Sequence, residues 1–515
     1  MSSRPLTSAL PAQAMTIESP AASRTPWARL ATGAVSFVAL LVVVCFLAGT
    51  APDADLWGHL TFGRDIVQTG WVHTSDPYSF ASDQPWINHE WLAEMVMWSA
   101  YSVGGAPGLV ALKLFMACIA GIALLETWRP RGLSGARRDA MVFVTALSTW
   151  PVLATMRPQA FSVAFFGVLL LTLDRVRCGG RRWLVALPLI FALWVNTHGG
   201  WIVGAGVLAV VVACSWFDPA WSNRDRLLLF ATACASALAT LCNPYGPAML
   251  GFLVETVRPA RTDIVEWQSA AHLPAVAFLL WLVPTLVGAQ VLWRSDRSSR
   301  PPLSSLIVVA LLAVGSFRVI RLVGFYSLAV GFLIVPSIRS VVAGAPVVPS
   351  LREWMRMAAA CVALVAIAVV IFGRTLTMDA EWLPEREAAV YVKTHDVRGR
   401  LLTWFDYGEF AIWHFSPAVR VSMDGRRETV YSEEMRERHR RIYMNTPEAL
   451  DEVARLNPDY VWLPAPFPVV PRLEASGWHR VFSGPRSVIL SKRIDDVVAI
   501  ASTDPTLPAR VFPGP

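Results

Sequence analysis

The sequence predicts a polytopic α-helical membrane protein with about eleven transmembrane helices, followed by a C-terminal extracytoplasmic α/β domain. The chain is 54% hydrophobic and only 16% charged, which is far from the balance of a soluble globular protein. Apolar runs long enough to cross a hydrocarbon core of about 30 Å recur from Leu30 to Gly373, and the chain has an ordinary soluble composition from Arg374 onward. The predicted parts are a cytoplasmic tail (1–29), a membrane domain (30–373) and the C-terminal domain (374–515).

The apolar run 30–50 is not followed by a small-residue cleavage site, so we expect a retained span rather than a removed signal peptide. The predicted spans are 30–50, 107–126, 140–156, 160–173, 183–195, 200–217, 227–241, 274–293, 303–317, 322–338 and 357–373. Short cytoplasmic loops carry an excess of Lys and Arg. Alternate loops are arginine-rich here, whereas the first loop, 51–106, contains only Arg64. We therefore expect a cytoplasmic N-terminus and an extracytoplasmic C-terminal domain in a bacterial plasma (inner) membrane.

Composition argues against several functional classes. The formal net charge of +7 comes largely from arginines in those short loops, so topology explains it without a nucleic-acid partner. The seven cysteines have no CxxC spacing, which indicates neither a disulfide framework nor a zinc site. Neither a GxGxxG motif nor a P-loop is present, so nothing supports a sugar-nucleotide donor.

The first loop has the most informative sequence. Asp53 and Asp55 follow the first span directly, which places two carboxylates at the membrane surface, where such a group can act as a general base or hold a metal. Residues 56–69 and 89–101 are predicted to form short helices, the second lying flat in the interface because it is too short to cross. The segments DPYSF and QPW between them supply turns and amphipathic aromatic side chains.

Most of the unusual polar residues near the membrane are predicted to lie at the same outer depth. Ionisable groups at a bilayer boundary are costly unless they line a cavity or pair with one another, so this clustering predicts a hydrated, outward-open site. For any single residue, a polar anchor at a helix end is an equally good interpretation, and for the histidines a structural hydrogen bond is the better one. The residues are Asp53, Asp55, His59, Arg64, Arg157, Asn196, His198, Asn243, Tyr245, Arg318 and Arg321.

The C-terminal domain is predicted to be a small α/β sandwich. Strand-like runs lie at 400–404, 419–423, 460–463, 478–482 and 487–491, with helical stretches at 384–394, 433–443 and 447–456. Asp406 follows one strand, and Asp424 and Arg426 follow the next. If those strands are parallel, these groups share the sheet edge at which ligands gather. Contact with a sugar or acceptor glycan is one interpretation, and an ion pair that docks the domain on the membrane portion is the other.

The chain resembles the GT-C glycosyltransferases, which use polyprenyl-phosphate-linked sugars. The shared features are an acidic motif directly after the first span, interfacial helices in that loop, many spans and a C-terminal α/β domain. More closely, the chain resembles a poorly characterised group of bacterial multi-pass membrane proteins usually placed in that superfamily. The resemblance extends over about residues 30 to 490 and is carried by DADLWGHLTFGRDI, DPYSF, NHEWLAE, MRPQAFS, WVNTHGGW, LCNPYG and DGRRETVY.

The resemblance implies a catalytic carboxylate in the first loop, here Asp55 or Asp53, and Asp55 is favoured because His59 lies one helical turn away. This carboxylate would deprotonate the acceptor hydroxyl. In some branches it helps bind a divalent metal, so Mg²⁺ or Mn²⁺ at Asp53 and Asp55 stays open, and no other cofactor is indicated. The leaving phosphate needs positive charge nearby. Arginine is the better bidentate phosphate binder, and the candidates are Arg64, Arg157, Arg318 and Arg321, with Lys113 a weaker one.

The sequence therefore predicts a membrane glycosyltransferase that moves a hexosyl or pentosyl group from a polyprenyl-phosphate carrier to an extracytoplasmic lipid, glycan or protein acceptor. Besides the two carboxylates, the residues expected to contact substrate are His59, Arg64, Arg157, Asn196, His198, Arg318, Arg321, Asp424 and Arg426. One alternative is a transporter or flippase of lipid-linked saccharides, which would more often carry polar residues near mid-membrane and on both faces. The other is a non-catalytic membrane scaffold with an outer binding domain.

Overall fold

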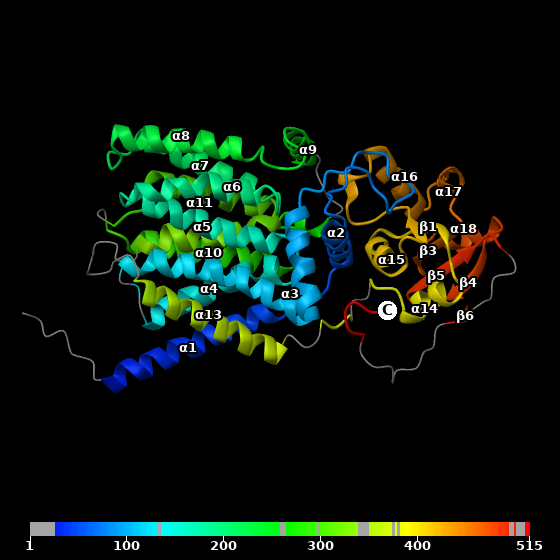
Figure 1. Ribbon diagram of the computed structural model, residues 1–515, viewed down its shortest axis with the longest axis horizontal. Helices are drawn as coiled ribbons and strands as arrows, with labels where there is room; N and C mark the ends of the chain where they lie inside the picture. The colour runs from blue at the N-terminus through cyan, green and yellow to red at the C-terminus, as the bar shows by residue number, and fades with distance from the viewer. Residues whose placement is uncertain are drawn as a thin grey trace, which may run out of the picture.

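The chain forms a long bundle of helices beside a smaller region built around one β-sheet (Figure 1). We call these the helical region (26–372) and the sheet region (382–493, with the strand 499–500). The computed structural model describes residues 26–131, 133, 135–257, 264–296, 299–337, 350–372, 376–378, 382–493, 499–500 and 510–515. The predicted tail 1–29 lies mostly outside the described residues.

Each of the eleven predicted spans coincides with a helix or with a run of consecutive helical segments. These helices are α1 (Pro26–Ala48), α3 (Trp91–Trp128), α4 (Gly135–Leu153), α5 (Gln159–Arg177), α6 (Ala186–Trp194), α7 (Trp201–Ser215), α8 (Asn223–Ala239), α10 (Ala275–Arg294), α11 (Leu303–Arg318), α12 (Val323–Ala329) and α13 (Leu351–Phe372). Within the described residues, five segments are long and apolar enough to cross a membrane: Trp91–Arg131, Gln159–Arg177, Ala275–Arg294, Ile320–Ser337 and Leu351–Phe372. The count of eleven spans stays a prediction. A further helix, α9 (Ala248–Val257), was not predicted.

The helix predicted at 56–69 is α2 (Leu56–Thr69), which ends at Gly70 in a left-handed conformation with φ 69°. The helix predicted at 89–101 is not separate from the following span, and this corrects the sequence interpretation. The two are joined in α3 across a kink at Gly105, where φ is 58° and ψ is −145°. Glycine tolerates this conformation, and Pro107 just after it lacks a backbone N–H. The first half of α3 therefore turns away from the second half and lies beside α2 (Figure 1).

The sheet has the strand order β2-β1-β3-β5-β4-β6. Strand β1 (Gly399–Thr403) pairs in parallel with both β2 (Val419–Val421) and β3 (Tyr460–Pro464), whereas β5 (Ser487–Ser491) runs antiparallel to β3 and to β4 (His479–Ser483). The five predicted strands and three predicted helices are present. The helices are α14 (Arg386–Thr394), α16 (Glu433–Tyr443) and α17 (Ala449–Leu456), and the elements not predicted are α15 (Gly408–Phe415), α18 (Val470–Ala475) and β6 (Ala499–Ile500).

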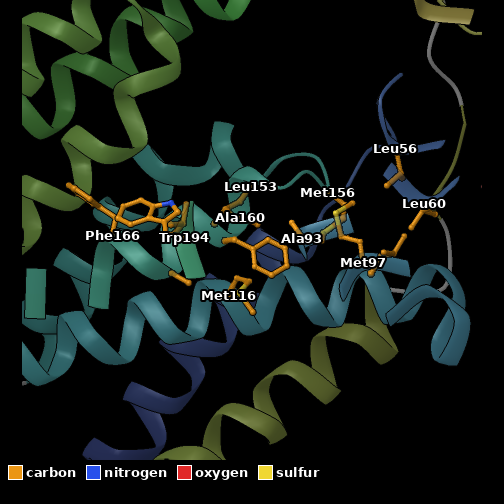
Figure 2. Packing of buried hydrophobic residues seen from close by; sticks show 14 of the residues in the cluster. Leu56, Leu60, Ala93, Met97, Met116, Leu153, Met156, Ala160, Phe166 and Trp194 are labelled. Atoms are coloured by element: carbon orange, nitrogen blue, oxygen red, sulfur yellow. The ribbon is translucent and has the colours of Figure 1, made fainter. Parts of the chain in front are cut away.

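One hydrophobic core runs from the helices into the sheet region. Figure 2 shows its path from Phe166 and Trp194 in the bundle to Leu56 and Leu60 of α2. The same cluster includes Phe410 of α15 and other residues of the sheet region. Helix α2 packs against both α3 and α15. Because apolar burial is the main favourable term in such contacts, α2 contributes much of the packing between the two regions. The loop after α2 adds a parallel bridge between Ser79 and Val421.

Candidate active site between the first loop and the sheet region

The backbone brings the first loop together with the loop that carries Arg157. The N–H of Ala51, just after α1, donates to the carbonyl of Ala154, just after α4, at 3.1 Å. Ala51 and Thr155 form a parallel bridge. Asp53 and Asp55 follow one side of this bridge and Arg157 follows the other, so residues about a hundred positions apart share one site.

Arg157 lies among three carboxylates. Its Nε contacts Asp53, its Nη2 lies 3.2 Å from Asp55 Oδ2, and its Nη1 lies 3.1 Å from Glu266 Oε1. Although burial disfavours the guanidinium charge, Asp53, Asp55 and Glu266 raise the pKa of Arg157 above its ordinary value. The side chain of Asp55 is 26% exposed and that of Asp53 is 12% exposed. Asp55 is therefore the carboxylate more open to a substrate.

Arg321 joins this cluster through Glu266. Its Nη1 lies 3.5 Å from Glu266 Oε2, and its guanidinium carbon lies 6.0 Å from the ring centre of Trp267. Arg321 and Arg157 thus lie near different oxygens of the same carboxylate. Two of the four arginines expected to meet a phosphate, Arg157 and Arg321, thus lie at the same carboxylate. Glu266, from the 3₁₀ turn Val265–Trp267, was not predicted.

His59 lies on α2 and pairs with α3. Its Nδ1 lies 3.0 Å from Glu94 Oε1, and the amide of Asn88 donates to Glu94 Oε2 at 2.6 Å. Although burial disfavours the imidazolium, the hydrogen bond to Glu94 and the charges of Glu90 and Glu94 raise the pKa of His59 to about 9. His59 is therefore a cation at neutral pH.

His198 is a neutral hydrogen-bonding residue. Its Nδ1 accepts from the backbone N–H of Gly200 at 3.0 Å and lies 2.7 Å from Ser162 Oγ, which in turn accepts from Trp194 Nε1. Its proton must therefore be on Nε2, which lies 3.9 Å from Glu90 Oε1. Burial, with Arg321 and His89 nearby, lowers the pKa of His198 well below its ordinary value.

The sheet region covers the same carboxylates. The backbone N–H of Gly58 in α2 donates to Glu409 Oε2 of α15 at 3.1 Å, and Glu409 is 3% exposed. Asp406, after β1, accepts from Trp404 Nε1 at 3.1 Å. Burial, and then Asp55, raises the pKa of Asp406 to about 6. Two carboxyl groups of the sheet region thus lie within electrostatic reach of Asp55.

Asp424 and Arg426 are buried in an ion-pair network. Arg426 donates to Asp424 through Nη2 at 2.7 Å and to Asp76 of the first loop through Nη1 at 2.7 Å. Its guanidinium also lies within 5.3 Å of the ring centres of Phe62, Tyr78 and Trp86. The parallel pairing of β1 and β2 does place Asp406 and Asp424 after adjacent strands at one edge. The geometry of Arg426 favours the docking interpretation over a sugar contact.

The structure places other predicted residues outside the Arg157 cluster. Arg64 pairs with Asp65 at 3.0 Å and lies 5.3 Å from the ring centre of Trp413, and Arg318 is exposed at the end of α11. Asn196 is buried, accepts from Trp91 Nε1 at 2.7 Å and donates to the carbonyls of Ala192 and Cys242. For Arg64, Arg318 and Asn196, contact with substrate stays a prediction.

Lys113 contacts the end of α1. It is buried, and its Nζ donates to the carbonyl oxygens of Gly49 at 2.9 Å and Leu153 at 2.8 Å. Those carbonyls lie at helix C-termini, which cations stabilise. These hydrogen bonds account for the buried ammonium group of Lys113 without a bound phosphate.

The residues do not fit a bound divalent metal at Asp53 and Asp55. The guanidinium of Arg157 contacts both carboxylates, in the position that a bridging cation would take. Within the part of the chain that the structure describes, no group of three His, Cys, Asp or Glu side chains is arranged to hold a metal ion. Ligand sets for Mg²⁺ and Mn²⁺ are usually rich in carboxylate and water oxygens. We therefore derive no step through a metal.

Four carboxyl groups of the site were not predicted to take part: Glu90, Glu94, Glu266 and Glu409. Glu90 and Glu94 lie in the NHEWLAE motif, and their i, i+4 spacing next to His89 was a usable signal. Glu409 lies in DYGEFAI, with nothing local to set it apart. Its proximity to α2 depends on contacts 351 residues apart in the sequence.

Comparisons with known proteins give a fold likeness. No protein-family model and no curated protein matches the chain. Among solved structures, the chain is similar to ArnT from Cupriavidus metallidurans, with a TM-score of 0.52 and 17% identity over 91% of this chain and 99% of that one. The protein has the fold of the GT-C glycosyltransferases, as the resemblance implied.

A second solved structure is similar over the same share of the chain. The arabinofuranosyltransferase AftD from Mycobacteria gives a TM-score of 0.48 and 14% identity, covering 91% of this chain and 42% of that one. This likeness is too low to carry an argument. At identities of this size, the comparison with ArnT concerns the fold and leaves the reaction to be argued from the site.

Proposed function

We propose that the protein is a membrane glycosyltransferase that moves a sugar from a polyprenyl-phosphate carrier to an acceptor outside the cytoplasm of a bacterial cell. The observation that carries the proposal is the position of Asp55. It is a partly exposed carboxylate beside Arg157 at the start of α2. It lies where the helical region, the first loop and the sheet region meet. The acceptor would be a lipid, glycan or protein, and the donor sugar a hexose or pentose.

The proposed reaction needs a base and an anion site. Asp55 removes the proton from the acceptor hydroxyl, whose oxygen then forms a bond to the anomeric carbon. The bond from that carbon to the phosphate oxygen breaks, and the polyprenyl phosphate leaves with the electron pair. Arg157 holds the Asp55 carboxylate in position through Nη2, which lies 3.2 Å from Oδ2. Arg321 is half-buried at the same cluster and stabilises the leaving phosphate.

The orientation follows the arginine distribution of the loops. With the N-terminus cytoplasmic and an odd number of spans, Asp53 and Asp55 face the outside together with the C-terminal domain (374–515). The proposed donor would reach Asp55 with its headgroup at that surface. We infer that the sheet region forms the outer boundary of the site.

The experiment is transfer of labelled sugar from a panel of polyprenyl-phosphate sugars to cell-envelope acceptors. Membranes with the wild-type protein are compared with Asp55→Asn and with Asp451→Asn, a matched change at an exposed position of α17. We expect transfer with wild type and Asp451→Asn and a loss of at least about a hundredfold with Asp55→Asn.

Three outcomes would overturn the proposal. Transfer that survives Asp55→Asn would remove the assigned base. Absence of transfer with every donor, together with protein-dependent movement of the lipid across the bilayer, would support a flippase instead, and absence of both activities would support a scaffold.

A further inference from the structure

Asp55 occupies a position in α2 at which an aspartate normally bonds to its own helix. It is the N-cap residue of α2. Aspartate is a preferred N-cap because its carboxylate accepts a hydrogen bond from the second or third backbone N–H of the helix. Here Asp55 has helical backbone angles, φ −81° and ψ −13°, and its side chain makes no such bond. The third N–H, that of Gly58, donates to Glu409 Oε2 instead, at 3.1 Å.

Glu409 reaches this N–H because glycines remove the intervening side chains. A Cβ on Gly58 would lie 2.1 Å from Glu409 Oε2. A Cβ on Gly425 would lie 2.4 Å from Asp55 Oδ1 and 2.7 Å from Glu409 Oε1. Both carboxyl groups therefore lie against the same Cα of the sheet region. A side chain at either position would push these carboxyl groups out of their present places.

We propose that Glu409 is a positioning residue for Asp55: it caps α2 in place of Asp55 and so leaves the Asp55 carboxylate free to act. This inference rests on the proposed function, because it assigns a role in catalysis to a group of the sheet region. It also gives the sheet region a specific task. Asp55 is available only while α15 is packed against α2.

The burial of Glu409 is consistent with this role. Burial, and then the charges of Asp55 and Asp424, raise the pKa of Glu409 well above its ordinary value. Glu409 Oε2 accepts the N–H of Gly58 at 3.1 Å. Glutamine has the same shape and the same acceptor. Alanine has no acceptor, and Asp55 would then turn to cap its own helix.

The kinetic test compares Glu409→Ala and Glu409→Gln in the labelled-sugar assay, with Glu434→Ala as a control at an exposed position of α16. We expect Glu409→Ala to lower kcat by about tenfold with KM for donor and acceptor unchanged, which is the order expected from removing one hydrogen bond. Glu409→Gln should restore kcat to within about twofold of wild type. Equal reductions in both variants, or wild-type kcat in Glu409→Ala, would overturn the proposal.

A second measurement is independent of the reaction. Hydrogen exchange of a peptide covering the first turn of α2 is followed in Asp55→Ala, Glu409→Ala and the double variant. Either carboxyl group can cap Gly58, so each single variant should keep its protection and only the double variant should lose it. Loss of protection in Glu409→Ala alone would overturn the capping exchange. If no sugar transfer is found at all, this result still decides the inference about Asp55 and Glu409.

Limited proteolysis distinguishes the positioning role of Glu409 from a role in packing the sheet region against the helical region. If Glu409→Ala releases the sheet region from the helical region while Glu409→Gln does not, Glu409 is required for packing, and the positioning role is overturned. We expect the same cleavage pattern in wild type and both variants, because Asp76 and Arg426 still join the two regions.

Discussion

Arg426 Nη1 of the sheet region lies 2.7 Å from Asp76 Oδ1 of the first loop, and both side chains are at most 5% exposed. Asp424 contacts the same guanidinium, so one cation neutralises two buried carboxylates. A buried ion pair adds little when complete, but removing one partner leaves an uncompensated charge. This network fixes how the sheet region sits on α2.

Arg426→Met should lower the free energy of unfolding by about 3 to 5 kcal/mol, because Asp76 and Asp424 would be buried without a cation. Thermal unfolding of the purified protein in detergent measures the change, with Arg455→Met, at an exposed partner of Glu452, as the control. If Arg426 contacts sugar instead, KM for donor or acceptor would rise while the unfolding midpoint stays unchanged.

Arg157→Lys should reduce kcat by about ten- to a hundredfold, since an ammonium group cannot reach three carboxylates as a planar guanidinium does. The control is Arg177→Lys, which alters a pair with Asp218 outside the site. Steady-state sugar transfer measures both. A wild-type rate in Arg157→Lys would show that charge alone is required at this position.

Arg321→Gln should raise KM for the polyprenyl-phosphate donor, while Arg318→Gln should leave it close to wild type. The reason is position: Arg321 lies next to Glu266 in the cluster, and Arg318 is exposed at the end of α11. Removing a cation that binds a phosphate weakens affinity by about tenfold or more. Donor titration at fixed acceptor measures the two values, and a larger effect at Arg318 would move the phosphate site.

The pair of His59 with Glu94 predicts a pH dependence of stability. The pKa of His59 is raised from 6.5 to about 9 in the folded protein. The stabilisation is therefore complete below pH 6.5 and is lost as the pH rises through about 9. The unfolding midpoint of wild type should fall between pH 7 and pH 9.5, and the fall should be smaller in His59→Gln. Equal slopes in the two proteins would contradict the ion pair.

Local patterns in the sequence predicted the elements themselves. Apolar runs predicted the helices of the bundle, because an apolar segment of about 20 residues is typical of a membrane-spanning helix. Alternation of strand and helix patterns predicted β1 to β5 with α14, α16 and α17 for a similar reason. The sequence prediction separated two helices that are joined in α3. The chain is helical on both sides of Gly105, and only that residue leaves the helical conformation. Helix α15 (GEFAIWHF) was missed because its mostly buried, apolar and aromatic residues lack the amphipathic pattern that marks α17 (ALDEVARL).

The sequence by itself determined that Asp53 and Asp55 follow the first span, and that Arg157, Arg321 and His198 belong to loops on the same predicted side. Only the tertiary structure decided which of them meet. It placed Arg157 between Asp53 and Asp55, and it brought Glu409 to the N-terminus of α2. Residue type and hydropathy are read locally along the chain. A contact between residues 351 positions apart depends on how the hydrophobic core closes around α2.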